Sequence, residues 1–120
     1  MGRQEDIIAF SQSEKLKAGV IWIQQIATSY VNLTDERTMG LRMAVEQMMG
    51  LLSHELLLAK RVSPQEEWLE VEKAFNKASV MLASDPHQLG VQECIYHLSQ
   101  ALSHITNIGQ RTMERLFREA

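Results

Sequence analysis

Apolar side chains recur at intervals of three or four residues in four segments of this chain. An α-helix has 3.6 residues per turn, so this spacing places each row on one face of a helix. The rows are Leu16, Val20, Ile23, Ala27 and Val31; Leu41, Val45, Met48, Leu52, Leu56, Ala59 and Val62; Trp68, Val71, Phe75, Ala78 and Leu82; and Val91, Ile95, Leu98, Leu102 and Ile105. The sequence therefore predicts four amphipathic helices.

Helix-start signals precede the last three rows. Thr34 stands before two acidic residues, Ser63 stands before Pro64, and Asp85 stands before Pro86. A cap side chain accepts a hydrogen bond from a free backbone N–H of the first turn, and proline has no N–H to leave unpaired there. Each of these short sequences therefore indicates the beginning of a helix.

The helices are expected to be joined by short connections, which make successive helices antiparallel neighbours. We therefore expect one domain, residues 1–120, with an all-α fold: a four-helix up-and-down antiparallel bundle. The expected helices cover residues 12–32, 35–61, 64–83 and 86–118, and residues 4–11 can extend the first.

The fourth expected helix is much longer than the third, so its C-terminal part should extend beyond that neighbour. In this topology the N-terminal segment lies at the same end of the bundle. We expect its apolar residues to pack on the overhang and its acidic residues to face the arginines there; a frayed tail is the alternative. The residues concerned are Glu5, Asp6, Ile7, Ile8 and Phe10, with Arg111, Met113, Arg115, Leu116, Phe117 and Arg118.

Composition limits the classes of function. A net charge of −3 provides no overall attraction to nucleic acid. The uncharged residues 18–34 include too many amides and hydroxyls for a membrane span. A single cysteine excludes an internal disulfide, and no secretory signal pattern occurs at the start. We therefore expect a cytoplasmic protein that binds neither nucleic acid nor a membrane.

Catalytic sequence patterns are missing. The chain has no G-x-S-x-G elbow, no P-loop and no dinucleotide-binding fingerprint. Cys94 falls on the same helix face as Leu98, which indicates a small buried hydrophobic residue rather than a nucleophile. The prediction is a non-enzymatic protein without a cofactor.

Histidines supply the alternative, a metal, cofactor or phosphotransfer bundle that uses His54, His97 and His104. His97 and His104 are seven residues apart, which corresponds to roughly 10 Å along a helix, too far for both to bind one ion. Neither the Glu-x-x-His element of di-iron bundles nor an H-E-x-x-H pair occurs.

The segment SHEL, residues 53–56, places His54 before an acidic residue on an expected helix. It resembles locally the phosphoacceptor motif of sensor histidine kinases. That motif continues with a basic residue and a proline, whereas this chain continues LLLAKR and has no Gly-rich nucleotide-binding pattern. The resemblance therefore implies at most phosphotransfer through His54, and kinase activity is excluded.

Two of the expected helices contain a long stretch with no charged residues, even on the face that points away from the core. Residues 94–110 and residues 18–34 contain no Asp, Glu, Lys or Arg. A solvated helix face is normally charged, as expected for the third helix at Glu66, Glu67, Glu70, Lys73 and Lys77. The first and fourth helices adjoin in the expected bundle, so their uncharged backs can form one surface.

Charge depletion with aromatic and small polar residues is typical of the core of a protein interface. We therefore predict protein–protein association, as an adaptor, a chaperone-like protein or a regulatory module, through a homodimer or a partner complex. Ile21 and Tyr96 are the expected anchors, and a merely neutral surface is the alternative. The predicted interface comprises Ile21, Gln25, Thr28, Tyr96, Gln100, Ser103 and Asn107.

Overall fold

A computed structural model of the chain describes residues 2–30, 35–63, 65–84 and 88–119. These ranges form four helices and no strand. None of the described helices is both long and apolar enough to cross a lipid bilayer. The helices are α1 (Arg3–Tyr30), α2 (Asp35–Val62), α3 (Trp68–Ser84) and α4 (Gln88–Glu119).

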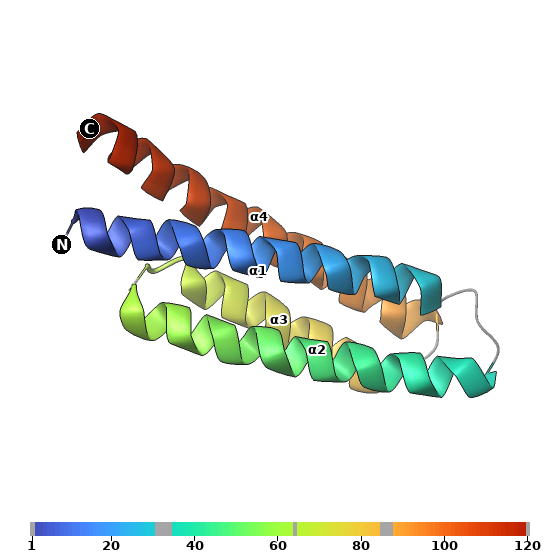
Figure 1. Ribbon diagram of the computed structural model, residues 1–120. Coiled ribbons are helices and arrows are strands. Elements are labelled where there is room, and N and C mark those ends of the chain that lie inside the picture. The colour runs from blue at the N-terminus through green and yellow to red at the C-terminus, as the bar shows by residue number, and fades with distance from the viewer. Residues whose placement is uncertain (1, 31–34, 64, 85–87, 120) are drawn as a thin grey trace.

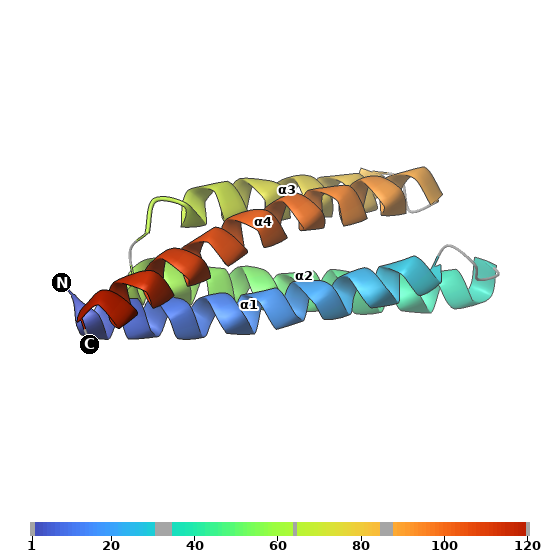
Figure 2. The ribbon, with the colours of Figure 1, turned by 90° about the horizontal axis from the view of Figure 1, so that it is seen from above.

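Each helix packs against two others. α1 and α3 both contact α2 and α4, and neither diagonal pair of helices is in contact among the described residues. Successive helices run in opposite directions, and both termini lie at one end of the molecule (Figure 1). Figure 2 shows α4 crossing from the side of α3 to the N-terminal half of α1. The predicted all-α, four-helix antiparallel bundle is confirmed.

The core takes one row of side chains from each helix. Leu16 and Ile23 of α1, Trp68 of α3, and Leu98 and Ile105 of α4 are all fully buried, as their spacing predicts. The core extends through other members of the same rows, including Val20, Ala27, Val45, Leu56, Ala59, Val71, Phe75, Ala78, Leu82 and Val91.

The row predicted for α2 is only partly correct. Met48 and Leu52 are half-buried and Val62 is exposed, whereas Met49, outside the predicted row, is buried. α2 is therefore turned so that Val45, Met49 and Leu56 face the core. The flank of α2 beside α1 is left partly open to solvent.

α3 begins four residues later than predicted. The backbone N–H of Trp68 donates to the carbonyl of Gln65 at 3.1 Å, so a tight turn precedes the helix. The Ser63 hydroxyl contacts the carbonyl oxygen of Glu5 in α1 at 3.4 Å, and the Trp68 indole N–H donates to the Ser63 carbonyl at 2.9 Å. Ser63 thus connects the turn to α1.

Other predicted helix-start residues, Thr34, Pro64, Asp85 and Pro86, lie outside the described residues, as does Val31.

The N-terminal part of α1 is ordered helix and meets the overhang of α4. The buried Asp6 carboxylate accepts a hydrogen bond from Arg115 Nε at 3.0 Å, as the sequence predicts. The prediction for Arg111 is wrong in part, because that side chain bonds to Glu67 instead. Ile7 is half exposed and Phe117 is largely exposed, so this end of the bundle is less fully packed than expected.

Two glycines mark where α1 comes closest to its neighbours. A Cβ on Gly109 of α4 would lie 2.7 Å from the Ser13 Oγ, and a Cβ on Gly19 of α1 would overlap the Leu52 Cδ2. Both separations are shorter than van der Waals contact. The absence of a side chain at these positions therefore lets α4 and α2 approach α1 closely.

Two leucines of α4 provide a matched test of the core. Leu98 is fully buried and Leu89 is 64% exposed. Leu98→Ala removes apolar contacts and leaves a cavity, so we expect the free energy of unfolding to fall by about 2 to 5 kcal/mol. Leu89→Ala should change it by less than about 0.5 kcal/mol. Urea denaturation followed by circular dichroism measures both, and equal effects would show that the faces of α4 are misassigned.

Candidate functional site

The predicted interface residues are all exposed. Ile21, Gln25 and Thr28 lie on α1, and Tyr96, Gln100, Ser103 and Asn107 lie on α4. The two helices are neighbours, as the prediction requires. Gln24 joins them by donating from Nε2 to Ser99 Oγ at 2.9 Å.

These seven residues are called the α1–α4 surface below, and most of them are polar. Ile21 and Tyr96 are its only large apolar side chains. The Thr28 hydroxyl donates to the Gln24 carbonyl of the preceding turn at 2.7 Å, so part of its hydrogen-bonding capacity is used within α1. Tyr96 and Gln100 line a groove on the side of α4 that faces α3. Tyr96, Gln100 and Asn107 therefore lie toward α3, and the seven residues do not form one compact patch.

The alternative histidine site divides between two parts of the bundle. His97 and His104 line the groove between α3 and α4, which has a volume of about 260 Å³. His54 is exposed on α2, a helix that does not contact α4 in the described structure. No group of three His, Cys, Asp or Glu side chains suited to a metal ion occurs among the described residues.

Glu67 forms the most connected polar cluster of the described residues. Its carboxylate accepts hydrogen bonds from His104 Nδ1 at 2.7 Å, from Asn107 Nδ2 at 3.0 Å and from the Arg111 guanidinium. Burial tends to raise the pKa of Glu67, but the bonds from His104, Arg111 and Asn107 outweigh it and the pKa is lowered. The carboxylate therefore stays ionised and fastens the beginning of α3 to α4.

The sequence reading placed Glu67 on the solvated face of the third helix, which is wrong. Its side chain is 14% exposed. Because α3 begins at Trp68, Glu67 belongs to the preceding turn and can reach α4. Asn107, predicted to be at the interface, is likewise engaged within the chain.

Cys94 is buried, as predicted. Its Sγ lies 3.9 Å from the Met49 Sδ in the core. Burial raises the pKa of the Cys94 thiol to about 11. The thiolate is the reactive form of cysteine, so the protonated Cys94 thiol has low reactivity at neutral pH.

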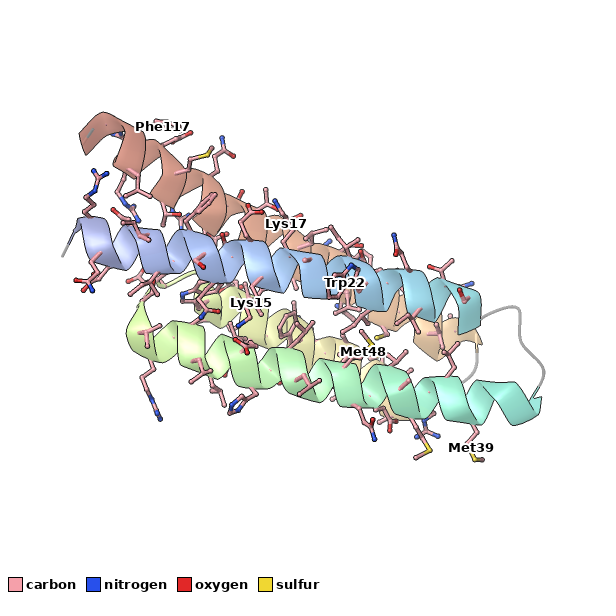
Figure 3. The ribbon with its side chains drawn as sticks, in the orientation of Figure 1. Lys15, Lys17, Trp22, Met39, Met48 and Phe117 are labelled. Carbon is pink, nitrogen blue, oxygen red and sulfur yellow. The ribbon has the colours of Figure 1, made fainter. Side chains whose placement is uncertain are left out.

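An apolar groove lies between α1 and α2 and was not predicted. It has a volume of about 420 Å³, and its exposed lining is almost wholly apolar. At one end the Lys15 Nζ lies 3.2 Å from the Glu55 Oε2. Figure 3 views this face, with Lys15 and Trp22 on α1 and Met48 on α2. The apolar lining includes Ala18, Gly19, Trp22, Met48, Leu51 and Leu52.

Two large apolar side chains of the groove are mostly exposed to solvent. Trp22 is 61% exposed and Leu51 is 68% exposed. Leu58 and Val62 are also exposed, and their spacing from Leu51 by seven and eleven residues places them on the same side of α2. The groove together with Leu58 and Val62 is called the α1–α2 face below.

A signal for this face was present in the sequence. Leu51, Leu58 and Val62 form a second apolar row on α2, with Glu55 between them. The sequence reading assigned one row to each helix and took Val62 for core. Trp22 precedes the core residue Ile23 directly and therefore lies on a different face of α1, outside the predicted row.

The Glu67 cluster predicts a pH-dependent contribution to stability. Glu67→Gln removes the ionised acceptor, so the free energy of unfolding at neutral pH should fall by about 1 to 2 kcal/mol. The folded pKa of Glu67 is lowered from its ordinary value of 4.5, so this contribution is present above that value and is lost as the pH falls through the folded pKa. Denaturation from pH 7 downward should show the two proteins converging.

The exposed neighbour Glu66 provides the control for that measurement. Glu66→Gln should leave stability unchanged at each pH. A Glu67→Gln deficit that stays constant well below pH 4.5 would contradict the assignment to an ionised carboxylate.

The burial of Cys94 predicts that its thiol reacts slowly with disulfide reagents in the folded protein. A rise in pKa from 9.0 to about 11 lowers the thiolate fraction at pH 8 by roughly a hundredfold, and burial adds a steric barrier. A disulfide reagent such as Ellman's should therefore leave the native protein unmodified and label one thiol per chain in urea. Rapid labelling of the native protein would show that Cys94 is accessible.

No protein-family model matches this chain, and neither a curated protein nor a solved structure is significantly similar to it. The case for a function therefore depends on the surfaces of the bundle. Of these, the α1–α2 face combines exposed apolar side chains with an apolar groove.

Proposed function

We propose that this protein acts without catalysis, by binding a protein partner through the α1–α2 face. The exposure of Trp22 and Leu51 beside an apolar groove carries the proposal. A contiguous exposed apolar surface is costly in water and commonly marks an interaction site. Tryptophan is enriched at protein interfaces because its rigid ring buries a large area. An adaptor, a chaperone-like protein or a regulatory module of the cytoplasm would use such a face.

The outer surface of α3 has more charged pairs than this face, although Leu69 and Val80 are exposed there. On α3, Lys73 pairs with Glu70 at 3.3 Å, and Glu72 pairs with Lys60 of α2 at 3.0 Å. Such charged pairs are typical of a helix surface that stays in water. The contrast supports the α1–α2 face as the contact surface.

The chemistry of the groove favours binding over catalysis. In the described part of the chain, its lining contains no Cys, His, Ser, Thr or Tyr. Lys15 and Glu55 are its only ionisable side chains, and they pair with each other. The lining therefore offers apolar contact area and one matched pair of charges.

The α1–α4 surface is a second candidate for the same kind of function. All seven of its predicted residues are exposed, and none of them is charged. A homodimer anchored on Ile21 and Tyr96 remains a prediction for this surface.

Three charge substitutions distinguish the surfaces. Leu51→Glu introduces a carboxylate on the α1–α2 face, and Ser103→Glu introduces one on the α1–α4 surface. Leu57→Glu is the matched control, because Leu57 is also exposed on α2 but on the side turned away from α1. All three positions are exposed, so circular dichroism should show unchanged helix content.

Each variant is immobilised, and the proteins that it captures from cell extract are identified by mass spectrometry. Binding of the free chain to its immobilised copy is measured in the same experiment. Wild type and Leu57→Glu should retain a protein that Leu51→Glu loses, because an unpaired charge at an interface core weakens binding by at least roughly tenfold. Loss with Ser103→Glu alone would move the contact to the α1–α4 surface. A wild-type chain that is monomeric and retains no protein would overturn the proposed function.

A further inference from the structure

We propose that the partner of the α1–α2 face is the same face of a second copy, with the two-fold axis running parallel to the helices. This inference rests on the proposed function and adds the identity and the geometry of the partner. A two-fold dimer uses one surface patch on both subunits, so the patch must complement itself. Three properties of the α1–α2 face meet that requirement.

Charge is the first property. Lys15 on α1 and Glu55 on α2 face each other across the end of the groove, with their charged atoms 3.2 Å apart. A two-fold axis along the groove places α1 of one copy over α2 of the other without changing the level along the bundle. Lys15 of each copy then lies over Glu55 of the other. Both cross-chain contacts are attractive, and no charge of the groove is left unmatched.

Apolar shape is the second property. Trp22 on α1 lines the same groove as Met48 and Leu51 on α2. The same symmetry places each Trp22 against Met48 and Leu51 of the second copy. Trp22 and Leu51, the large exposed apolar side chains of the groove, then each meet an apolar surface.

Size is the third property. α1 and α2 each have 28 residues, which corresponds to a length of roughly 42 Å. The bundle is 20 Å across, so the whole side of the bundle formed by α1 and α2 has an outline of roughly 800 Å², and the groove lies near the middle of that side. A stable interface of standard size buries about that area on each partner. The whole side that contains the α1–α2 face is therefore large enough for a dimer, whereas a single bound helix would cover only part of it.

Charge reversal provides the decisive test. Lys15→Glu and Glu55→Lys each leave like charges facing across both chains of a homodimer, so each variant alone should show a Kd raised at least roughly tenfold. In an equimolar mixture, the new carboxylate of one variant faces the new ammonium of the other, and the two unaltered groups also match. The mixture should therefore dimerise, although each chain still carries its own like-charged pair.

Light scattering coupled to size exclusion at tens of micromolar measures these masses, and mass spectrometry of the mixed dimer gives its composition. Wild type and Leu57→Glu should be dimers, and Leu51→Glu should be a monomer. If each charge-reversed variant dimerises as tightly as wild type, the proposed geometry is overturned. A dimer that survives Leu51→Glu but not Ser103→Glu overturns it too.

Tryptophan quenching gives an independent readout. Trp22 is 61% exposed in the single chain and Trp68 is fully buried. Acrylamide quenching should fall severalfold as the concentration rises, because the dimer covers Trp22. Trp22→Phe leaves Trp68 alone and gives the background. Quenching that is independent of concentration in a dimer would show that Trp22 lies outside the contact, and would overturn the proposal.

A monomeric wild type has two distinct meanings. If the wild type captures another protein and the Leu51→Glu variant does not, the second-copy inference fails and the proposed function stands. If it captures no protein, both fail.

Discussion

Burial of the apolar row of α4 against both α1 and α3 is the interaction on which the rest of this bundle depends. Leu98 and Ile105 are fully enclosed in that row, and α4 is the longest helix. Because α4 crosses from α3 to α1, a single row connects the two helices that do not contact each other (Figure 2). The position of α1, and hence the groove that it forms with α2, follows from this packing.

Polar contacts then fix the ends of the helices relative to one another. Glu67 binds the turn before α3 to α4, and Asp6 binds the beginning of α1 to Arg115 near the end of α4. Each such contact contributes little compared with the buried core, but each has a directional requirement. The hydrophobic core thus provides most of the stability, and the polar contacts set the register at the end where the termini meet.

The α1–α2 groove arises from how these requirements combine. α1 directs its core row mainly toward α4, and α2 is turned so that Met49 rather than Met48 is buried. α2 keeps a second apolar row that the core cannot accommodate, which includes Leu51, and the exposed Trp22 of α1 lines the same groove. Gly19 still allows Leu52 to approach α1 closely, so the floor of the groove is packed while its walls remain exposed. An exposed surface of this composition is suited to binding another protein.

By itself the sequence determined the helical class, the number of helices and most of the core, because spacing by three and four residues fixes which side chains share a helix face. It also indicated that Cys94 is buried and that acidic residues near the N-terminus face arginines near the end of α4, and Asp6 and Arg115 form that contact. Only the tertiary structure decided which of two apolar rows on α2 faces the core, since periodicity gives a face but not the rotation of a helix between its neighbours. It also decided the partners of Glu67, because residues that lie 37 to 44 positions apart in the chain meet only after α3 and α4 have packed.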